Sequence, residues 1–124
     1  MANKRKKKNY RWKLVGGPMY VDKRDKRYAG YVAEMKKTGV SPDETWSLDL
    51  TIALFVLPRL KLFKELTISY PCDMTMDGWY AELDKMIAAF ELICSEKAFP
   101  TKDEQSKINA GLDSFRKYFE ALWW

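Results

Sequence analysis

The segment from Leu48 to Phe63 constrains the fold most, because it is a long and mostly apolar run. Its β-branched residues are compatible with a strand over 51–57. However, apolar residues continue at helical spacing past the usual length of a strand, namely Leu50, Ala53, Leu54, Leu57 and Leu60. We therefore expect a helix that is buried on most sides. Pro58 removes one backbone hydrogen bond and should kink this helix near its middle.

Three further segments also carry helical signals. A helix is predicted over 22–37, where the apolar positions 28, 31, 32 and 35 form one stripe before Gly39. Another is predicted over 76–95, and a last one follows the capping-box pattern at 101–104. The sequence thus predicts an all-α fold, a compact bundle of about four helices around the central Pro-kinked helix. The expected core contains Leu54, Leu57, Leu83, Phe90, Leu112, Phe115 and Phe119.

Charge is distributed unevenly along the chain. Residues 1–37 hold thirteen Lys/Arg and three Asp/Glu, a net charge of +10, whereas residues 38–124 hold nine and fourteen, a net charge of −5. A run of like charges cannot fold on its own, and 16–18 is Gly-Gly-Pro, which breaks regular structure. We therefore divide the chain into a basic flexible arm over 1–21 and one helical domain over 22–124.

Most classes of catalytic and metal site find no support in the residues. The chain has no His, and its two cysteines, Cys72 and Cys94, cannot complete a four-ligand zinc site. We read both cysteines as reduced thiols. The longest uncharged apolar run, 50–58, is much shorter than the ~20 residues that span a bilayer. We expect a protein that is not an enzyme, with no cofactor, no metal and no membrane partner.

Two charges lie within the apolar segment and predict a structural ion pair. Asp49 and Arg59 are each embedded among apolar residues, and buried charges are normally paired. Arg59 with Asp84, or Asp49 with Lys85, would satisfy this requirement.

The arm carries the main functional signal, because it interleaves basic and aromatic side chains. Lys and Arg neutralise phosphates, and aromatic rings stack on unpaired bases. An acidic protein surface, or no function beyond solubility, would suit the same arm. The nucleic-acid-binding residues that we predict are Lys4, Arg5, Lys6, Lys7, Lys8, Tyr10, Arg11, Trp12, Lys13, Arg24 and Arg27.

Four blocks of the sequence resemble a group of small uncharacterised helical proteins encoded by bacteriophages and prophages. These blocks are 46–49, 57–64, 83–91 and 111–119. The resemblance implies a phage-type protein in a bacterial cytoplasm and assigns no activity to any residue. We therefore expect a non-enzymatic binding protein that engages nucleic acid or a nucleoprotein complex, with a CRISPR-type host-defence effector as one candidate target. The alternative is a virion or assembly component that packs through its helical surface. The oligomeric state is left open.

Overall fold

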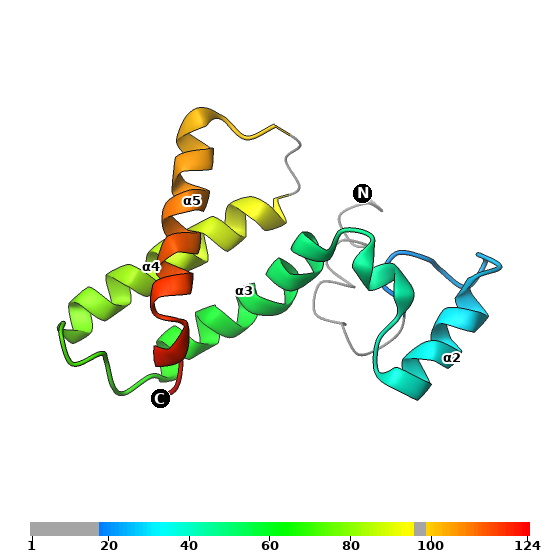
Figure 1. Cartoon of the computed structure of the whole chain (residues 1–124), viewed down its shortest axis with the longest axis horizontal. Helices are drawn as coiled ribbons and strands as arrows, with labels where there is room; N and C mark the ends of the chain where they lie inside the picture. Colours follow the sequence, from blue (N-terminus) through cyan, green and yellow to red (C-terminus); the bar gives the residue numbers. More distant parts are fainter. Residues whose placement is uncertain (1–17, 96–98) are drawn as a thin grey trace. The chain divides into compact units, whose positions relative to one another are not determined.

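A computed structural model describes residues 18–95 and 99–124, and the all-α fold is confirmed there. No strand occurs in those two ranges, and 51–57 is helical. Pro58 lies inside the helix that was predicted from the apolar segment, which continues to Leu66. In chain order the elements are α2 (Tyr28–Thr38), the 3₁₀ turn η1 (Pro42–Thr45), α3 (Leu48–Leu66), α4 (Met76–Cys94), α5 (Lys102–Lys117) and the 3₁₀ turn η2 (Phe119–Ala121) (Figure 1).

The helix ends follow local capping chemistry. The Thr75 side chain accepts a hydrogen bond from the N–H of Gly78 at the start of α4. Thr101 and Glu104 form the predicted capping box at the start of α5. Gly39 ends α2 in the left-handed conformation with φ at 85°, which a residue with a Cβ rarely adopts. These local signals explain why three of the four helices begin or end close to their predicted positions.

The first helix begins later than predicted, at Tyr28 rather than at position 22. The carboxylates of Asp22 and Asp25 each accept a hydrogen bond from the backbone N–H two residues ahead, of Arg24 and Arg27, both at 2.9 Å. Such bonds offer the backbone an alternative to the helix. The segment 22–27 therefore forms turns.

The chain divides into two compact units, Met1–Phe55 (unit 1) and Val56–Trp124 (unit 2), with the division inside α3. The sequence predicted one helical domain over 22–124, and that boundary also needs correction at its start. Met19 and Val21 are buried in the described structure, with 4% and 8% of their surface exposed. Residues 18–21 thus belong to the folded part of unit 1 and not to a flexible arm.

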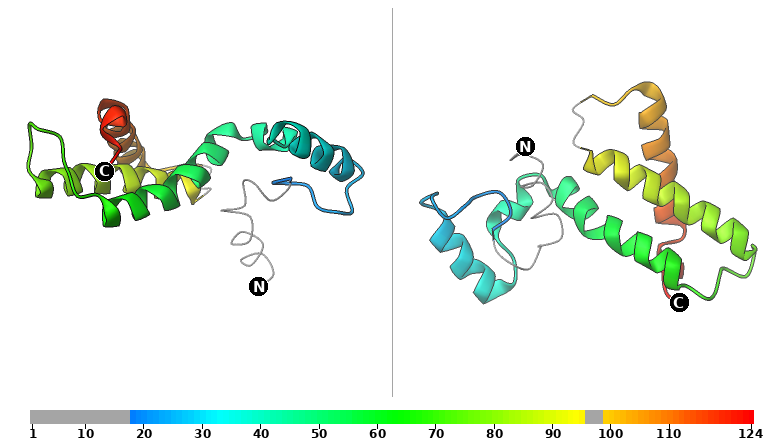
Figure 2. Two further views of the ribbon diagram at one scale, coloured as in Figure 1. Left: turned by 90° about the horizontal axis from the view of Figure 1, so that it is seen from below. Right: turned by 180° about the vertical axis from the view of Figure 1, so that it is seen from behind.

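Unit 2 is organised by the crossing of α4 and α5, which Figure 2 shows from two further sides. The crossing is close at Gly111, where an added Cβ would clash with the Cβ of Ala89 and the carbonyl oxygen of Lys85. The buried side chains come mainly from α4 and include Trp79, Leu83, Met86 and Phe90. Short-range ring contacts continue this core, such as Phe90 with Phe115 at 5.2 Å between centroids.

The predicted core is confirmed for one residue of α3 and two of α4, and it is wrong for Leu112 of α5 and Phe119 of η2. Leu54, Leu83 and Phe90 are buried, but Leu112 and Phe119 are 39% and 60% exposed. The face of α5 that is buried carries the small residues Gly111 and Ser114. Small side chains let the two helices approach closely, so the large apolar residues beside them are left toward solvent.

Candidate nucleic-acid interface

Asp43 binds residues 19–21, which closely follow the N-terminal residues that the structure does not describe. Its carboxylate is fully buried and accepts hydrogen bonds from three successive backbone N–H groups, those of Met19 at 3.2 Å, Tyr20 at 2.6 Å and Val21 at 3.1 Å. The hydroxyl of Ser41 donates to the same carboxylate. A buried charge is tolerated when it is hydrogen-bonded in this way. Asp43 therefore fixes the chain direction at residues 19–21.

The start of α3 is tied to the same anchor. The Thr51 hydroxyl donates to the carbonyl oxygen of Glu44 at 2.7 Å and lies 3.4 Å from the sulfur of Met19. Thr51 is itself buried. The root of the N-terminal segment is therefore held by η1 and the first turn of α3 together.

Nine of the eleven predicted nucleic-acid-binding residues, those from Lys4 to Lys13, lie outside the described residues. The net charge of the sequence before residue 18 can still be compared with the net charge of the described part of unit 1. Residues 18–55 hold six Lys/Arg and six Asp/Glu, a net charge of zero, whereas residues 1–17 hold seven Lys/Arg and no Asp/Glu. The net positive charge of unit 1 therefore belongs entirely to the residues before the anchor.

The two remaining predicted residues, Arg24 and Arg27, both have carboxylate partners. Arg24 pairs with Asp22 at 3.0 Å, and its side chain is 89% exposed. Arg27 binds the carboxylate of Asp25 through two nitrogens, at 2.9 and 2.7 Å. Hydrogen bonds from these arginines lower the pKa of each carboxyl below its ordinary value, so both acids stay ionised. The two arginines are thus neutralised locally, and their use for phosphates would compete with Asp22 and Asp25.

Arg27 also belongs to an aromatic cluster that the sequence reasoning missed. Its guanidinium carbon lies 5.0 Å from the centroid of the Trp46 ring. Tyr20 stacks against Trp46 with 6.0 Å between centroids and 15° between planes, and Tyr31 meets it edge-on at 6.4 Å. Trp46 nevertheless remains 51% exposed. Tyr31 was identified as part of the apolar stripe of the first helix, but no local pattern connects these four residues.

A second polar surface lies in unit 2, in an open groove of about 370 Å³ between α3 and α4. The cations in and beside it have carboxylate partners. Lys64 contacts Asp84 at 2.8 Å, and Lys61 contacts Glu91 at 3.0 Å. A groove with paired charges gives no net attraction for a charged ligand, so it does not support a binding site.

The prediction of a buried ion pair around Asp49 and Arg59 is wrong, since both residues are exposed. Asp84, one proposed partner, binds Lys64, and Lys85, the other, binds Glu82. The buried carboxylate of the described chain is instead that of Asp43, and backbone N–H groups and a hydroxyl compensate it. A charge within an apolar stretch of sequence can still face solvent, because a helix exposes some positions even when its composition is apolar.

Other kinds of site find no support within residues 18–95 and 99–124. No group of three or more His, Cys, Asp or Glu side chains is placed to hold a metal ion there. Within those ranges, no helix has the length and apolar character needed to cross a membrane. No protein-family model, no curated protein and no solved structure matches this chain.

Proposed function

We propose that this is a non-enzymatic binding protein whose basic N-terminal segment engages nucleic acid or a nucleoprotein complex. The observation that carries the proposal is the separation of charge within unit 1. Seven Lys/Arg stand in residues 1–17 without one carboxylate, while residues 18–55 are balanced. Cations of this density in the sequence gain affinity for phosphates by releasing counterions.

The anchor at Asp43 supports the same proposal. A basic segment that is joined to a fixed point loses less freedom on binding than one that is joined to a loose tail. The three N–H bonds to Asp43 fix the chain at Met19, Tyr20 and Val21, only six residues after Lys13. The residues that follow the basic segment are therefore fixed to the folded part of unit 1.

The biological setting rests on the resemblance to phage and prophage proteins. A phage-type protein in a bacterial cytoplasm meets nucleoprotein complexes of the host, including CRISPR-type defence effectors. Inhibition of such an effector is one form that this function could take, and it rests on an analogy between classes of protein.

The proposal is tested by comparing the full chain with a chain that lacks residues 1–13. Binding of a labelled twelve-nucleotide strand is followed by fluorescence anisotropy at low salt, and we expect the deletion to remove most of the affinity. Circular dichroism of the deleted chain checks that the helices persist. Equal affinity of the two proteins would overturn the proposal and would direct attention to an acidic protein partner.

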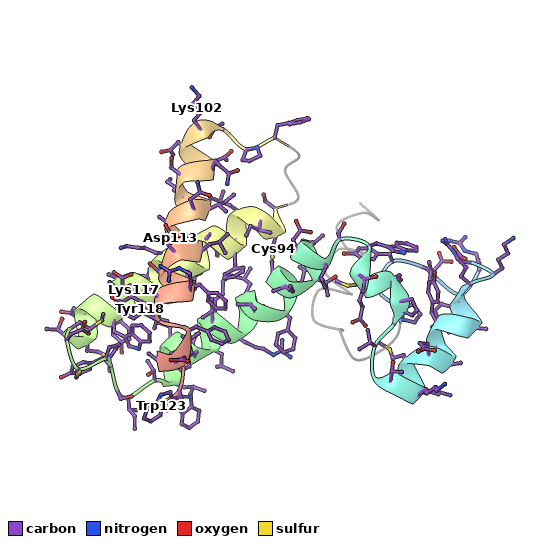
Figure 3. The ribbon with its side chains drawn as sticks, in the orientation of Figure 1. Cys94, Lys102, Asp113, Lys117, Tyr118 and Trp123 are labelled. Atoms are coloured by element: carbon purple, nitrogen blue, oxygen red, sulfur yellow. The ribbon has the colours of Figure 1, made fainter. Side chains whose placement is uncertain are left out.

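A second candidate function is assembly of copies through unit 2. The observation in its favour is the exposed apolar surface of that unit, where Phe119 is 60% exposed and Trp123, at the end of the chain in Figure 3, is 70% exposed. Large exposed apolar patches mark interaction sites. A discrete oligomer in sedimentation velocity that is lost in a Phe119→Ser/Trp123→Ser variant would support a virion or assembly role.

A further inference from the structure

We propose that Trp46, together with Arg27, is a stacking platform for an unpaired base beside the root of the basic segment. The inference rests on the proposed function and narrows its ligand to nucleic acid with unpaired bases. The first block of the resemblance includes Trp46 but gives it no role, and its contacts in unit 1 carry the inference.

The first step is the fixed position and the accessibility of the indole. Tyr20 stacks on it, Tyr31 meets it edge-on, and the Arg27 guanidinium lies over its ring. Despite these three neighbours, 51% of Trp46 is exposed. The residue is thus held in place on some sides while a substantial part of it remains open to a ligand.

The second step is the kind of ligand that suits this surface. An aromatic ring and a guanidinium plane can each stack on the π-face of a base, and every base offers such a face. Asp25 neutralises Arg27 through two hydrogen bonds, so the cluster itself adds little attraction for phosphates. The cluster therefore favours a base over a phosphate. In a duplex the base faces are already stacked, so a single strand should be preferred.

The third step is the connection to the basic segment. Tyr20, which stacks on Trp46, is anchored by its N–H to Asp43. Lys13 precedes Tyr20 by seven residues, so their Cα atoms are at most about 25 Å apart. At a rise of about 3.4 Å per nucleotide along one strand, that distance corresponds to about seven nucleotides. A strand of twelve nucleotides is long enough to contact both Lys13 and the platform.

The test compares two substitutions at Trp46 in the full chain. Trp46→Leu removes the ring but keeps apolar bulk for Tyr20 and Tyr31, whereas Trp46→Phe keeps a ring face. Affinities for a twelve-nucleotide thymidine strand and for the corresponding dA·dT duplex are measured by anisotropy. Phe99→Leu is the matched control, because it removes an 87% exposed ring from unit 2.

We expect Trp46→Leu to weaken binding of the single strand about 5- to 150-fold, the range for loss of one base–aromatic stack. Binding of the duplex should change by less than about twofold, and Trp46→Phe should retain most of the single-strand affinity. Phe99→Leu should behave as the wild type. Equal weakening of both ligands by Trp46→Leu, or no weakening of either, would overturn the proposal.

A second measurement needs no variant and therefore does not depend on whether Trp46→Leu folds. The wild-type chain is photocrosslinked to a strand that carries bromodeoxyuridine, and the modified peptides are identified by mass spectrometry. A crosslink at Trp46 is expected, and its absence alongside crosslinks in residues 1–17 overturns the platform while the proposed function stands. Loss of affinity on deleting residues 1–13 tests that function separately, and a full chain that binds neither oligonucleotide refutes both.

Discussion

Substitution of Asp43 by alanine should release residues 19–21 from unit 1. Ordering three residues costs about 3–6 kcal/mol of backbone entropy, at 1–2 kcal/mol each. Burial of the Met19 and Val21 side chains returns a similar amount, about 1.5–3 kcal/mol each. Three hydrogen bonds to the Asp43 carboxylate add about 1.5–3 kcal/mol each, or about 4.5–9 kcal/mol together. Because the entropy cost and the gain from burial are similar, these three hydrogen bonds provide the net free energy that holds residues 19–21 in place.

Without the carboxylate, the net free energy that holds residues 19–21 on unit 1 falls to about zero or becomes unfavourable. The reason is that the buried N–H groups of Met19 and Val21 would also be left unpaired. Detachment into water is then the less costly outcome. Amide exchange followed by NMR should show protection at 19–21 falling by about 10³-fold or more in Asp43→Ala, since 1.4 kcal/mol corresponds to tenfold. Glu34→Ala, which removes an exposed carboxylate from the same unit, should leave these amides unchanged. Unaltered protection at 19–21 in Asp43→Ala would refute the anchor.

Two further predictions concern the contact between α4 and α5 in unit 2, and Gly30 of α2, in unit 1, is the comparison for the first. Gly111→Ala should destabilise unit 2 by about 1–3 kcal/mol in thermal or urea unfolding, because the new methyl group clashes with α4. Gly30→Ala has open space around it and should stabilise α2 by up to about 1 kcal/mol. A Gly111→Ala variant that is more stable than the wild type would contradict the close crossing of α4 and α5. The hydrogen bond from the Ser114 hydroxyl, at 2.7 Å, lowers the pKa of Glu82 in the folded protein. The stability that this bond contributes is therefore fully present above the ordinary glutamate pKa of about 4.3, and it is lost as the pH falls through the lowered pKa of the folded state. In Ser114→Ala, the free energy of unfolding should fall less on acidification than it does in the wild type. The same dependence of unfolding free energy on pH in the two proteins would count against a stabilising role for the Ser114–Glu82 hydrogen bond.

Local patterns predicted the helices well, because caps and helical stripes depend on neighbours within a few positions. The stripe at 28, 31, 32 and 35 consists of the partly buried positions of α2, and Thr101 with Glu104 caps α5 as expected. Asp43 shows where this reasoning stops. Ser41 and Glu44 form a capping box within three positions of each other, but the N–H groups that donate to Asp43 lie 22 to 24 positions earlier in the chain.

Packing between helices was equally beyond the reach of local patterns. The sequence predicted that Leu112 and Phe119 lie in the core, yet α5 presents Gly111 to α4, and both large residues are exposed. Large apolar residues and small residues both occur on α5, and hydrophobicity alone does not identify the small residues as the buried ones. Trp46 was missed for a related reason, since its partners Tyr20 and Tyr31 come from separate segments.

The salt dependence of nucleic-acid binding tests the central claim most directly. If about five of the seven Lys/Arg in residues 1–17 neutralise phosphates, the logarithm of affinity for the twelve-nucleotide strand should fall against the logarithm of salt with a slope of about −3.5. A duplex should give about −4.5, and the chain that lacks residues 1–13 should give a slope near zero. The same slope with and without those residues, or a flat response of the full chain, would contradict the account.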